Sequence, residues 1–88
     1  MTGINYKEQA KLLKAIAHPT RLHLLEIIRD TNPCVRSMEE ALGIAQPTVS
    51  QHLSILRNLG IVESERQGHQ VCYKIKNKTV LKLLDSID

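Results

Sequence analysis

The sequence predicts one mainly α-helical domain with about five helices and a small β-hairpin. Apolar residues recur at helical spacing through most of the 88 residues. The hairpin is predicted by residues 61–66 and 70–75, in which apolar and polar side chains alternate on either side of Gln67-Gly68-His69. No internal repeat, low-complexity tract or flexible linker divides residues 1–88, so we expect a single domain.

The first two helices are expected over about residues 5–17 and 19–29. Asn5 and Glu8 have the spacing of a capping box, which marks a helix start, and Pro19 suits the first turn of the second helix. Apolar residues occur on more than one side of that second helix: Leu22, Leu24, Leu25, Ile27 and Ile28. We therefore expect it at the centre of the domain.

The third helix is predicted from the residues at its ends. Asn32-Pro33 breaks the preceding helical pattern, and Cys34-Val35 is expected to form a short strand. Ser37 and Glu40 have the spacing of a second capping box. We expect this helix to begin at Ser37 and to end at Gly43, where glycine commonly stops a helix.

The fourth helix is expected to follow after a short turn, with Gln46 at its cap and Pro47 in its first turn, and to end before Gly60. Its inward residues recur at helical spacing: Val49, Leu53, Leu56 and Leu59. Two short helices joined by a tight turn are typical of a helix-turn-helix, here over about residues 37–59. With the hairpin as a wing over about residues 61–75, the fold class is a winged helix-turn-helix.

The last helix, from about Thr79 to Ile87, has more apolar surface than one contact with the domain requires, and the first helix shows a similar excess. We therefore predict a homodimer through the first and last helices. The expected interface residues are Leu13, Ile16, Val80, Leu81, Leu84 and Ile87. Such a dimer would hold two recognition helices about 34 to 36 Å apart. The alternative is that both helices cover the core of a monomer.

The composition favours duplex DNA as the partner. Twelve Lys and Arg against nine Asp and Glu give a net charge of +3, which suits a polyanion. Two Tyr and no Phe or Trp leave few of the aromatic platforms on which single-stranded nucleic acids stack. The N-terminus lacks the apolar core of a signal peptide, and no apolar run is long enough to span a membrane. We expect a cytoplasmic protein without a membrane partner.

An enzyme is not expected. The four glycines are scattered, and no residues are spaced as a nucleophile with its base, as paired carboxylates or as a phosphate-binding loop. No cofactor or metal is predicted. A winged-helix module that binds another protein remains an alternative.

The candidate DNA contacts lie on the fourth helix and the wing. They are Gln46, Pro47, Thr48, Ser50, Gln51, His52, Arg57, Arg66, Gln67 and His69, with Lys74 as a further cation near the wing. Gln can form two hydrogen bonds with the major-groove edge of adenine, and hydroxyls meet bases or phosphates. Gln46 is a poor cap compared with Ser, Thr, Asp or Asn, which suggests that its side chain serves a partner. His52 is expected either to form a hydrogen bond within the domain or to reach a phosphate.

Three blocks of sequence resemble the ArsR (ArsR/SmtB) family of winged-helix repressors. They are Ala17-His-Pro-Thr-Arg-Leu22, residues 40–57 and Gly60-Ile-Val62. The resemblance implies a homodimer that represses a promoter and releases it when an effector is sensed. Relatives that sense metals often carry Cys-x-Cys where this chain has Cys34-Val-Arg36, so metal sensing would require a non-standard site.

Cys34 and Cys72 are the remaining effector candidates. In a cytoplasmic protein we expect two thiols rather than a structural disulfide. The short strand before the third helix would lie beside the second wing strand and bring the two cysteines close together. We therefore hypothesise that oxidation or persulfide chemistry at these thiols shifts the wing. The alternative is that both are small apolar core residues.

Overall fold

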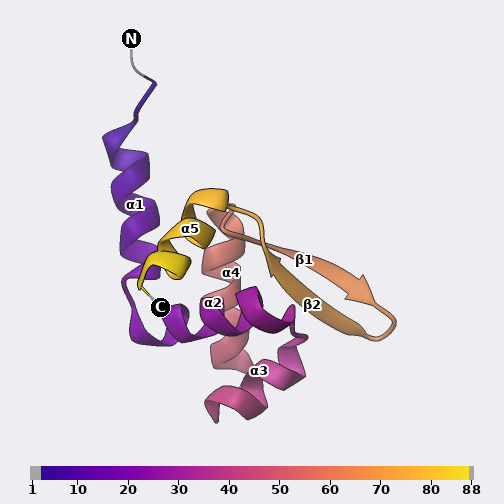
Figure 1. The fold of residues 1–88 in the computed structure, drawn as a ribbon. Coiled ribbons are helices and arrows are strands. Elements are labelled where there is room, and N and C mark those ends of the chain that lie inside the picture. Colours follow the sequence, from indigo (N-terminus) through magenta and orange to yellow (C-terminus); the bar gives the residue numbers. More distant parts are fainter. Residues whose placement is uncertain (1–2, 88) are drawn as a thin grey trace.

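The protein folds into five α-helices and one two-stranded antiparallel sheet within residues 3–87, the part of the chain that the computed structural model describes (Figure 1). The helices are α1 (Tyr6–Ile16), α2 (Pro19–Thr31), α3 (Val35–Leu42), α4 (Gln46–Asn58) and α5 (Lys78–Ile87), and the strands are β1 (Val62–Gln67) and β2 (Gln70–Ile75). The predicted fold class is confirmed.

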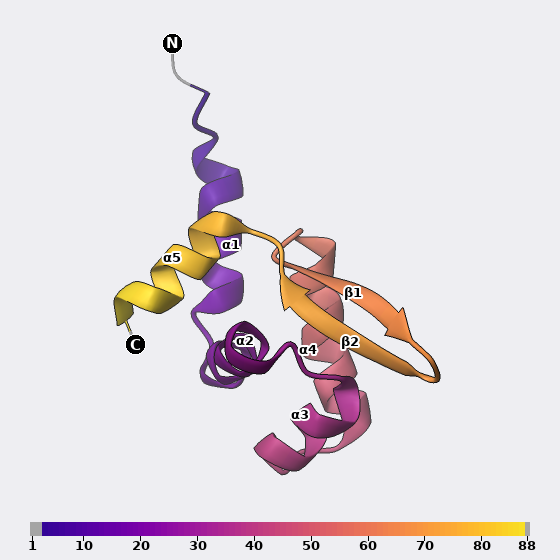
Figure 2. The same cartoon turned by 45° about the vertical axis from the view of Figure 1, so that its right-hand side comes forward.

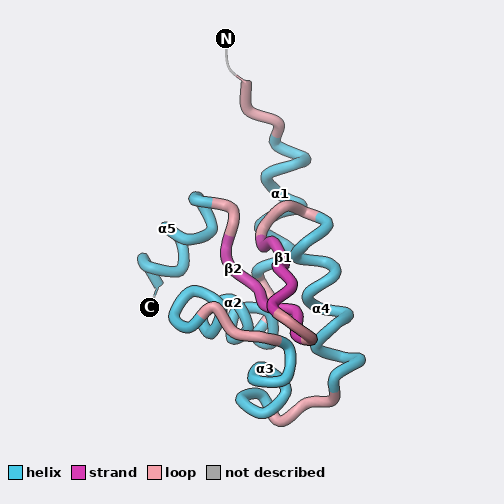
Figure 3. Tube along the Cα trace, turned by 90° about the vertical axis from the view of Figure 1, so that its right-hand side faces the viewer, coloured by secondary structure: helices cyan, strands magenta, loops and turns pink. Residues whose placement is uncertain are grey.

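The elements are arranged so that two parts of the molecule are displayed on different sides. Helices α1 and α5 lie on one side of α2, and the hairpin projects from the other side (Figures 1 and 2). The turn between α3 and α4 lies at the end of the molecule away from the start of α1 (Figure 3). The helix-turn-helix and the wing are therefore separate from the α1 and α5 surface.

Buried residues of α2 and α4 form a large part of the core, in line with the predicted central position of α2 and the predicted inward face of α4. Leu24, Leu25 and Ile28 of α2 are fully buried, as are Val49 and Leu56 of α4. Further buried residues come from the other elements: Ala15, Ile16, Met38, Leu53, Ile61, Val62, Val80 and Leu84. Because α2 contacts α1, α3, α5 and β2, it is the element around which the others pack.

The ends of α1 and α2 follow local signals. The Asn5 side chain accepts a hydrogen bond from the Glu8 backbone N–H at 3.2 Å, which confirms Asn5 as the N-cap of α1. His18 caps α2 in the same way, because its Nδ1 accepts from the Thr20 N–H at 3.2 Å. Helix α2 runs to Thr31, beyond the predicted end. Asn32 stops it in the left-handed region at φ 45°, a conformation that Asn tolerates better than most residues.

The predicted start of α3 is wrong. The helix begins at Val35, Cys34 is its N-cap without a side-chain capping bond, and Ser37 lies inside the first turn. The reason is tertiary: Cys34 forms an antiparallel bridge with Cys72, and the Tyr73 N–H donates to the Pro33 carbonyl at 2.9 Å. The expected strand at Cys34-Val35 is thus reduced to Cys34 alone. Pairing with β2, rather than the Ser37 and Glu40 box, sets where α3 starts.

Three of the six predicted interface residues lie in the core of a single protomer. Ile16, Val80 and Leu84 are buried there, with Leu84 only 4% exposed, so this part of the interface assignment has to be corrected. A domain of 88 residues has few apolar side chains to bury, so Ile16, Val80 and Leu84 are needed in the core of the protomer itself. Leu81 is half-buried, whereas Leu13 and Ile87 remain 48% and 66% exposed.

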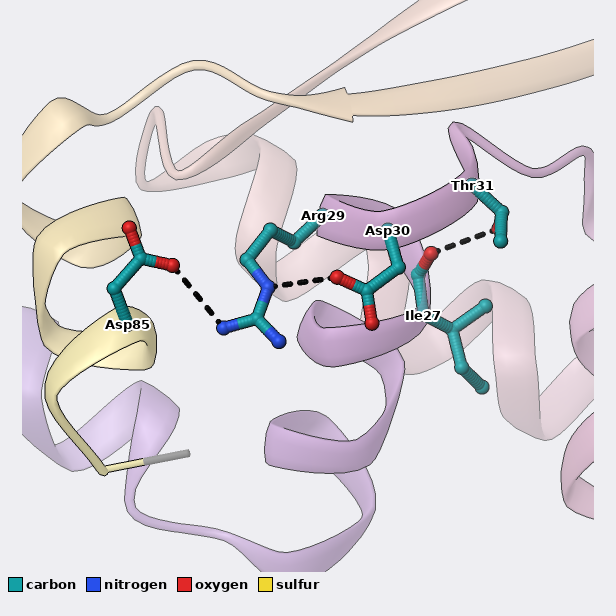
Figure 4. A network of polar contacts seen from close by, with 5 residues as sticks. All are labelled: Ile27, Arg29, Asp30, Thr31 and Asp85. Atoms are coloured by element: carbon teal, nitrogen blue, oxygen red, sulfur yellow. Dashed lines mark hydrogen bonds and ion pairs between the residues drawn. The ribbon is translucent and has the colours of Figure 1, made fainter.

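Helix α5 is joined to α2 by a small polar network (Figure 4). The Arg29 guanidinium donates to Asp30 at 2.9 Å and to Asp85 of α5 at 3.2 Å, and the Thr31 hydroxyl donates to the Ile27 carbonyl at 2.8 Å. Asn77 caps α5 through a bond from the Val80 N–H at 3.0 Å. Of these contacts, the one between Arg29 and Asp85 joins the two helices. None of the helices within residues 3–87 has both the length and the apolar character that a membrane span needs.

Candidate nucleic-acid interface

Helix α4 has one face in the core and one in solvent. Val49, Leu53 and Leu56 point inward and are buried, as predicted, whereas Leu59, the fourth predicted core residue, is the half-buried C-cap of the helix. On the opposite side Pro47, Thr48 and Gln51 are exposed and Ser50 is half-buried. The first two turns of the helix therefore present amide and hydroxyl groups, without a competing apolar surface, to whatever the helix meets.

Gln46 is not the cap of α4, in contrast to the prediction. Ala45 is the N-cap, and its carbonyl accepts from the Thr48 and Val49 N–H groups at 3.0 and 3.1 Å. Gln46 is the first helical residue, and its side-chain amide donates to the Ser50 hydroxyl one turn later. Ala45 offers no side-chain acceptor, Pro47 has no N–H, and the Thr48 N–H already donates to Ala45, so the first turn of α4 keeps few backbone donors for a phosphate.

His52 forms a hydrogen bond inside the domain, which is the first of the two roles considered for it. Its Nδ1 accepts from the Arg21 Nε–H at 3.2 Å, and its ring lies 5.0 Å from the His18 ring. The same Arg21 donates to the carbonyl of Ala15, in the last turn of α1, at 3.1 Å. Arg21 therefore ties α4 to the end of α1. Burial, followed by the charge of Arg21 and the neighbouring His18, lowers the pKa of His52 from 6.5.

This lowered pKa predicts a loss of stability in acid. The folded protein favours neutral His52, so the stabilisation is fully present above the ordinary pKa of 6.5 and is lost as the pH falls through the lower pKa of the folded state. We expect the melting temperature to fall between pH 7.5 and 5 by less in His52→Gln than in the parent. Gln can still accept from Arg21 but does not titrate. The control is His23→Gln, at an exposed position of α2, and an identical pH dependence in parent and His52→Gln would contradict the assignment.

The wing presents its polar residues at the tip of the hairpin. Arg66 and Gln67 belong to β1 and pair with Val71 and Gln70, so the tip consists of Gly68 and His69 rather than the three residues predicted. Arg66, Gln67 and His69 are all exposed. Gly68 has φ 67°, which the tight turn requires and which glycine adopts without strain.

The other predicted cations are placed less favourably. Lys74 forms an ion pair with Glu63 across the hairpin, Nζ to Oε1 3.2 Å, so its charge is partly neutralised. Arg57 is exposed in the last turn of α4, at the opposite end from Gln46. The structure brings Gln46 and His69 to one groove of about 570 Å³ between the wing and the helix-turn-helix. Arg57 does not line this groove.

Cys34 and Cys72 are adjacent, as predicted, but they form a disulfide rather than two thiols. The backbone pairing of Pro33 and Cys34 with β2 holds the two residues against each other. The disulfide therefore links the start of α3 to the second strand of the wing. Among the described residues, no three His, Cys, Asp or Glu side chains gather where they could hold a metal ion.

Arg21 is the residue that reasoning from the sequence missed. Its side chain joins α2, α4 and the last turn of α1. It lies within the His18-Pro19-Thr20-Arg21 block that carried part of the family resemblance. A contact between positions 31 residues apart cannot be derived from local spacing.

Comparison with known proteins agrees with this geometry. Residues 18–64 match the sequence profile described as "Bacterial regulatory protein, arsR family". The HTH-type transcriptional repressor SmtB of Mycobacterium tuberculosis is 42% identical over 65 residues, which are 74% of this chain and 48% of the repressor. The chain thus spans about half the length of this curated relative.

Two solved structures are similar over nearly the whole chain. HlyU from Vibrio cholerae has a TM-score of 0.90 and 28% identity, covering 98% of this chain and 94% of HlyU. A second is the homodimeric winged helix-turn-helix DNA-binding domain of Mb0332 from Mycobacterium bovis, described as a possible ArsR-family transcriptional regulator. Its TM-score is 0.85 at 27% identity, with 99% of this chain and 86% of that domain covered.

Proposed function

Because the chain belongs to the arsR family of bacterial regulatory proteins, we propose that it is a sequence-specific repressor that binds double-stranded DNA. Its family consists of regulators rather than enzymes. The observation that carries the proposal is the exposed polar face of α4, where Pro47, Thr48 and Gln51 point away from the core. A protein with this role acts in the cytoplasm, where bacterial DNA lies.

The proposed docking uses the exposed face of α4 and the wing. The first turns of α4 enter the major groove, where Gln51 pairs with an adenine and Thr48 and Ser50 meet bases or phosphates. Arg66, Gln67 and His69 on the wing contact the backbone, and Arg57 adds a cation at the other end of α4. His52, held by Arg21, orients α4 through its Nδ1 and has its Nε2–H left for a phosphate.

Substitution of Gln51 and Arg66 separates base contacts from phosphate contacts. On an operator selected from random DNA, Gln51→Ala is expected to cost about 1 to 3 kcal/mol and to relax the base preference. Arg66→Ala is expected to weaken binding to all sequences alike and to make the salt dependence shallower by about one unit. Fluorescence anisotropy at several salt concentrations measures both effects.

The matched control for Gln51 is Ser54→Ala, at an exposed position one turn further along α4. It is expected to bind like the parent. If Gln51→Ala and Arg66→Ala also bound like the parent, the docking would be wrong. If the parent showed no salt-dependent DNA binding at all, the winged-helix module would instead be one that binds another protein.

We also propose that the protein is a homodimer through α1 and α5. After the correction for buried residues, Leu13 and Ile87 remain as exposed apolar side chains, together with Tyr6 of α1, which is 77% exposed. These residues belong to the two helices that lie on one side of the molecule (Figure 2). The homodimeric Mb0332 domain has the same fold. The half-buried Leu81 is the other interface candidate of the original set.

For the effector, we propose that the redox state of Cys34 and Cys72 controls release. A disulfide between the start of α3 and the wing fixes these two DNA-facing parts relative to each other. In the reduced protein the wing can adjust to the DNA backbone while α4 is seated, and oxidation removes that adjustment. A reducing compartment then keeps the repressor on its operator until an oxidant forms the bond.

Operator affinity in the two redox states tests this part of the proposal. We expect the oxidised protein to bind at least about fivefold more weakly than the reduced protein. The Cys34→Ser, Cys72→Ser double variant should bind like the reduced protein, with or without oxidant. Equal affinity of the oxidised and reduced parent would remove the redox role and would leave the DNA-binding proposal intact.

A further inference from the structure

The two residues of the disulfide differ in their exposure to solvent. Cys72 is only 3% exposed, within β2. Cys34 is half-buried at the N-cap of α3 and lines the groove of about 570 Å³ between the wing and the helix-turn-helix. The depression that Cys72 lines, between Asn32 and the strands, is smaller, at about 220 Å³. A small molecule that approaches the disulfide therefore has more space beside Cys34 than beside Cys72.

The groove beside Cys34 has the size and the chemistry of a site for a small zwitterion. Its volume falls within the range of pockets that hold small ligands. Arg36 and Glu39 on α3 supply one charge of each sign, although the Arg36 Nε also lies 3.7 Å from the Glu40 Oε1. Gln46 of α4 and Gln70 of β2 supply amides. A carboxylate can pair with Arg36 and an ammonium group with Glu39. Peptide-like thiols carry both of these groups next to a nucleophilic sulfur.

We propose that a zwitterionic low-molecular-weight thiol opens the disulfide by attack on Cys34 and remains in this groove as a mixed disulfide. This inference rests on the redox part of the proposed function. The thiolate of the small molecule forms a new S–S bond to the Cys34 sulfur, the Cys34–Cys72 bond breaks, and Cys72 leaves as a thiolate that takes up a proton. A second small thiol then attacks the sulfur of the adduct, which releases Cys34 and the oxidised small disulfide.

Access decides which sulfur is attacked. Leaving-group strength alone would favour release of Cys34, because a thiolate at a helix N-terminus is stabilised by the free N–H groups there. Thiol exchange, however, also requires that the nucleophile reach the sulfur, and Cys72 is only 3% exposed whereas Cys34 is half-buried. The helix N-terminus acts instead in the second step, in which the Cys34 thiolate is the leaving group.

The adduct would lie between two sets of proposed DNA contacts. Gln46, at the start of α4, and His69, at the wing tip, line the same groove as Cys34. A tripeptide attached to Cys34 occupies the space between them and keeps the DNA backbone from approaching both. The mixed disulfide is therefore a form with weak operator affinity, separate from the internal disulfide.

Peptide mapping of the parent protein tests the proposal without any variant. The oxidised protein is mixed anaerobically with reduced glutathione, quenched early with iodoacetamide and digested with trypsin, which separates Cys34 in residues 30–36 from Cys72 in residues 67–74. We expect at least tenfold more glutathione on the peptide 30–36, with the alkyl group on the peptide 67–74. Equal distribution, or a majority on Cys72, overturns the inference and leaves the redox proposal standing.

Single-cysteine variants test the position of the adduct. Cys72→Ser is modified at Cys34 with oxidised glutathione or with methyl methanethiosulfonate, which adds only a thiomethyl group. We expect glutathione to reduce operator affinity at least tenfold and the thiomethyl group to change it less than twofold. An equal effect of the two would show that the groove does not hold the adduct. Circular dichroism of each modified protein checks that it stays folded.

Discussion

Reduction of the Cys34–Cys72 disulfide is expected to lower the free energy of unfolding by up to about 4 kcal/mol. The two residues are 38 positions apart. A crosslink that closes a loop of this length removes conformational entropy from the unfolded chain, and the chain-entropy relation gives about 4 kcal/mol for it. Small domains have only about 5 to 15 kcal/mol in total. The reduced protein is therefore much closer to its stability limit than the oxidised one.

Urea unfolding in the presence and absence of a phosphine reductant measures this difference. The midpoint should move to lower urea on reduction in the parent. The Cys34→Ser, Cys72→Ser variant should unfold at the same urea concentration with or without reductant, near that of the reduced parent. An unchanged midpoint in the parent would mean that the bond does not form in solution or does not constrain the unfolded chain.

Leu13→Asp is expected to weaken the dimer by about 2 to 4 kcal/mol, or roughly 30- to 1000-fold in its dissociation constant. Leu13 is already partly covered in one protomer, so the substitution removes only part of the free energy gained by burying a leucine. A twofold interface contains two copies of Leu13, so this loss occurs twice. The side chain lies outside the core, so the fold itself should be preserved. Sedimentation velocity over a range of concentrations measures the change.

Lys11→Gln is the matched control for Leu13→Asp. Lys11 is exposed on α1, two residues from Leu13 and so on another side of the helix, and its substitution lowers the charge by one unit, as Leu13→Asp does. It should dimerise like the parent. Leu84→Asp is unsuitable as an interface test, because Leu84 is buried in the protomer and the variant would unfold it. An intact dimer of Leu13→Asp would refute the interface.

Local signals predicted most of the elements. The Asn5 cap and Pro19 in the first turn of α2 appear as expected, and Gly43 ends α3 in the left-handed region at φ 66°. Each of these depends on residues within one turn, which the sequence displays directly. The inward face of α4 can likewise be predicted from the sequence, because leucine and valine at helical spacing define it.

The starts of α3 and α4 could not be predicted correctly, because neither is marked by a side-chain cap in the local sequence. A bridge between Cys34 and Cys72 fixes the start of α3, and no local pattern shows a contact between residues so far apart. For α4, Ala45 serves as N-cap without a side-chain acceptor, so the usual cap signal is missing. A reducing compartment favours two free thiols, whereas the backbone pairing that brings Cys34 against Cys72 is visible only in the fold.

The division between core and interface was also hidden from the sequence. The helical pattern shows that α5 is apolar over a wide arc, but it does not show which side meets α2. The structure assigns Val80 and Leu84 to the core and leaves Ile87 exposed. The contact of Arg29 with Asp85 also joins α5 to α2.

The Arg21 side chain also has a consequence for operator architecture. One of its nitrogens donates to the Ala15 carbonyl in the last turn of α1, and another donates to His52 of α4. Arg21 therefore couples the movement of α1, the helix proposed for dimerisation, to that of α4, the helix proposed for base contacts. In a dimer of such protomers, a small rotation at the subunit interface changes the centre-to-centre spacing of the two half-sites. Interface substitutions would then alter which spacer length is preferred, without any change in the bases that are read.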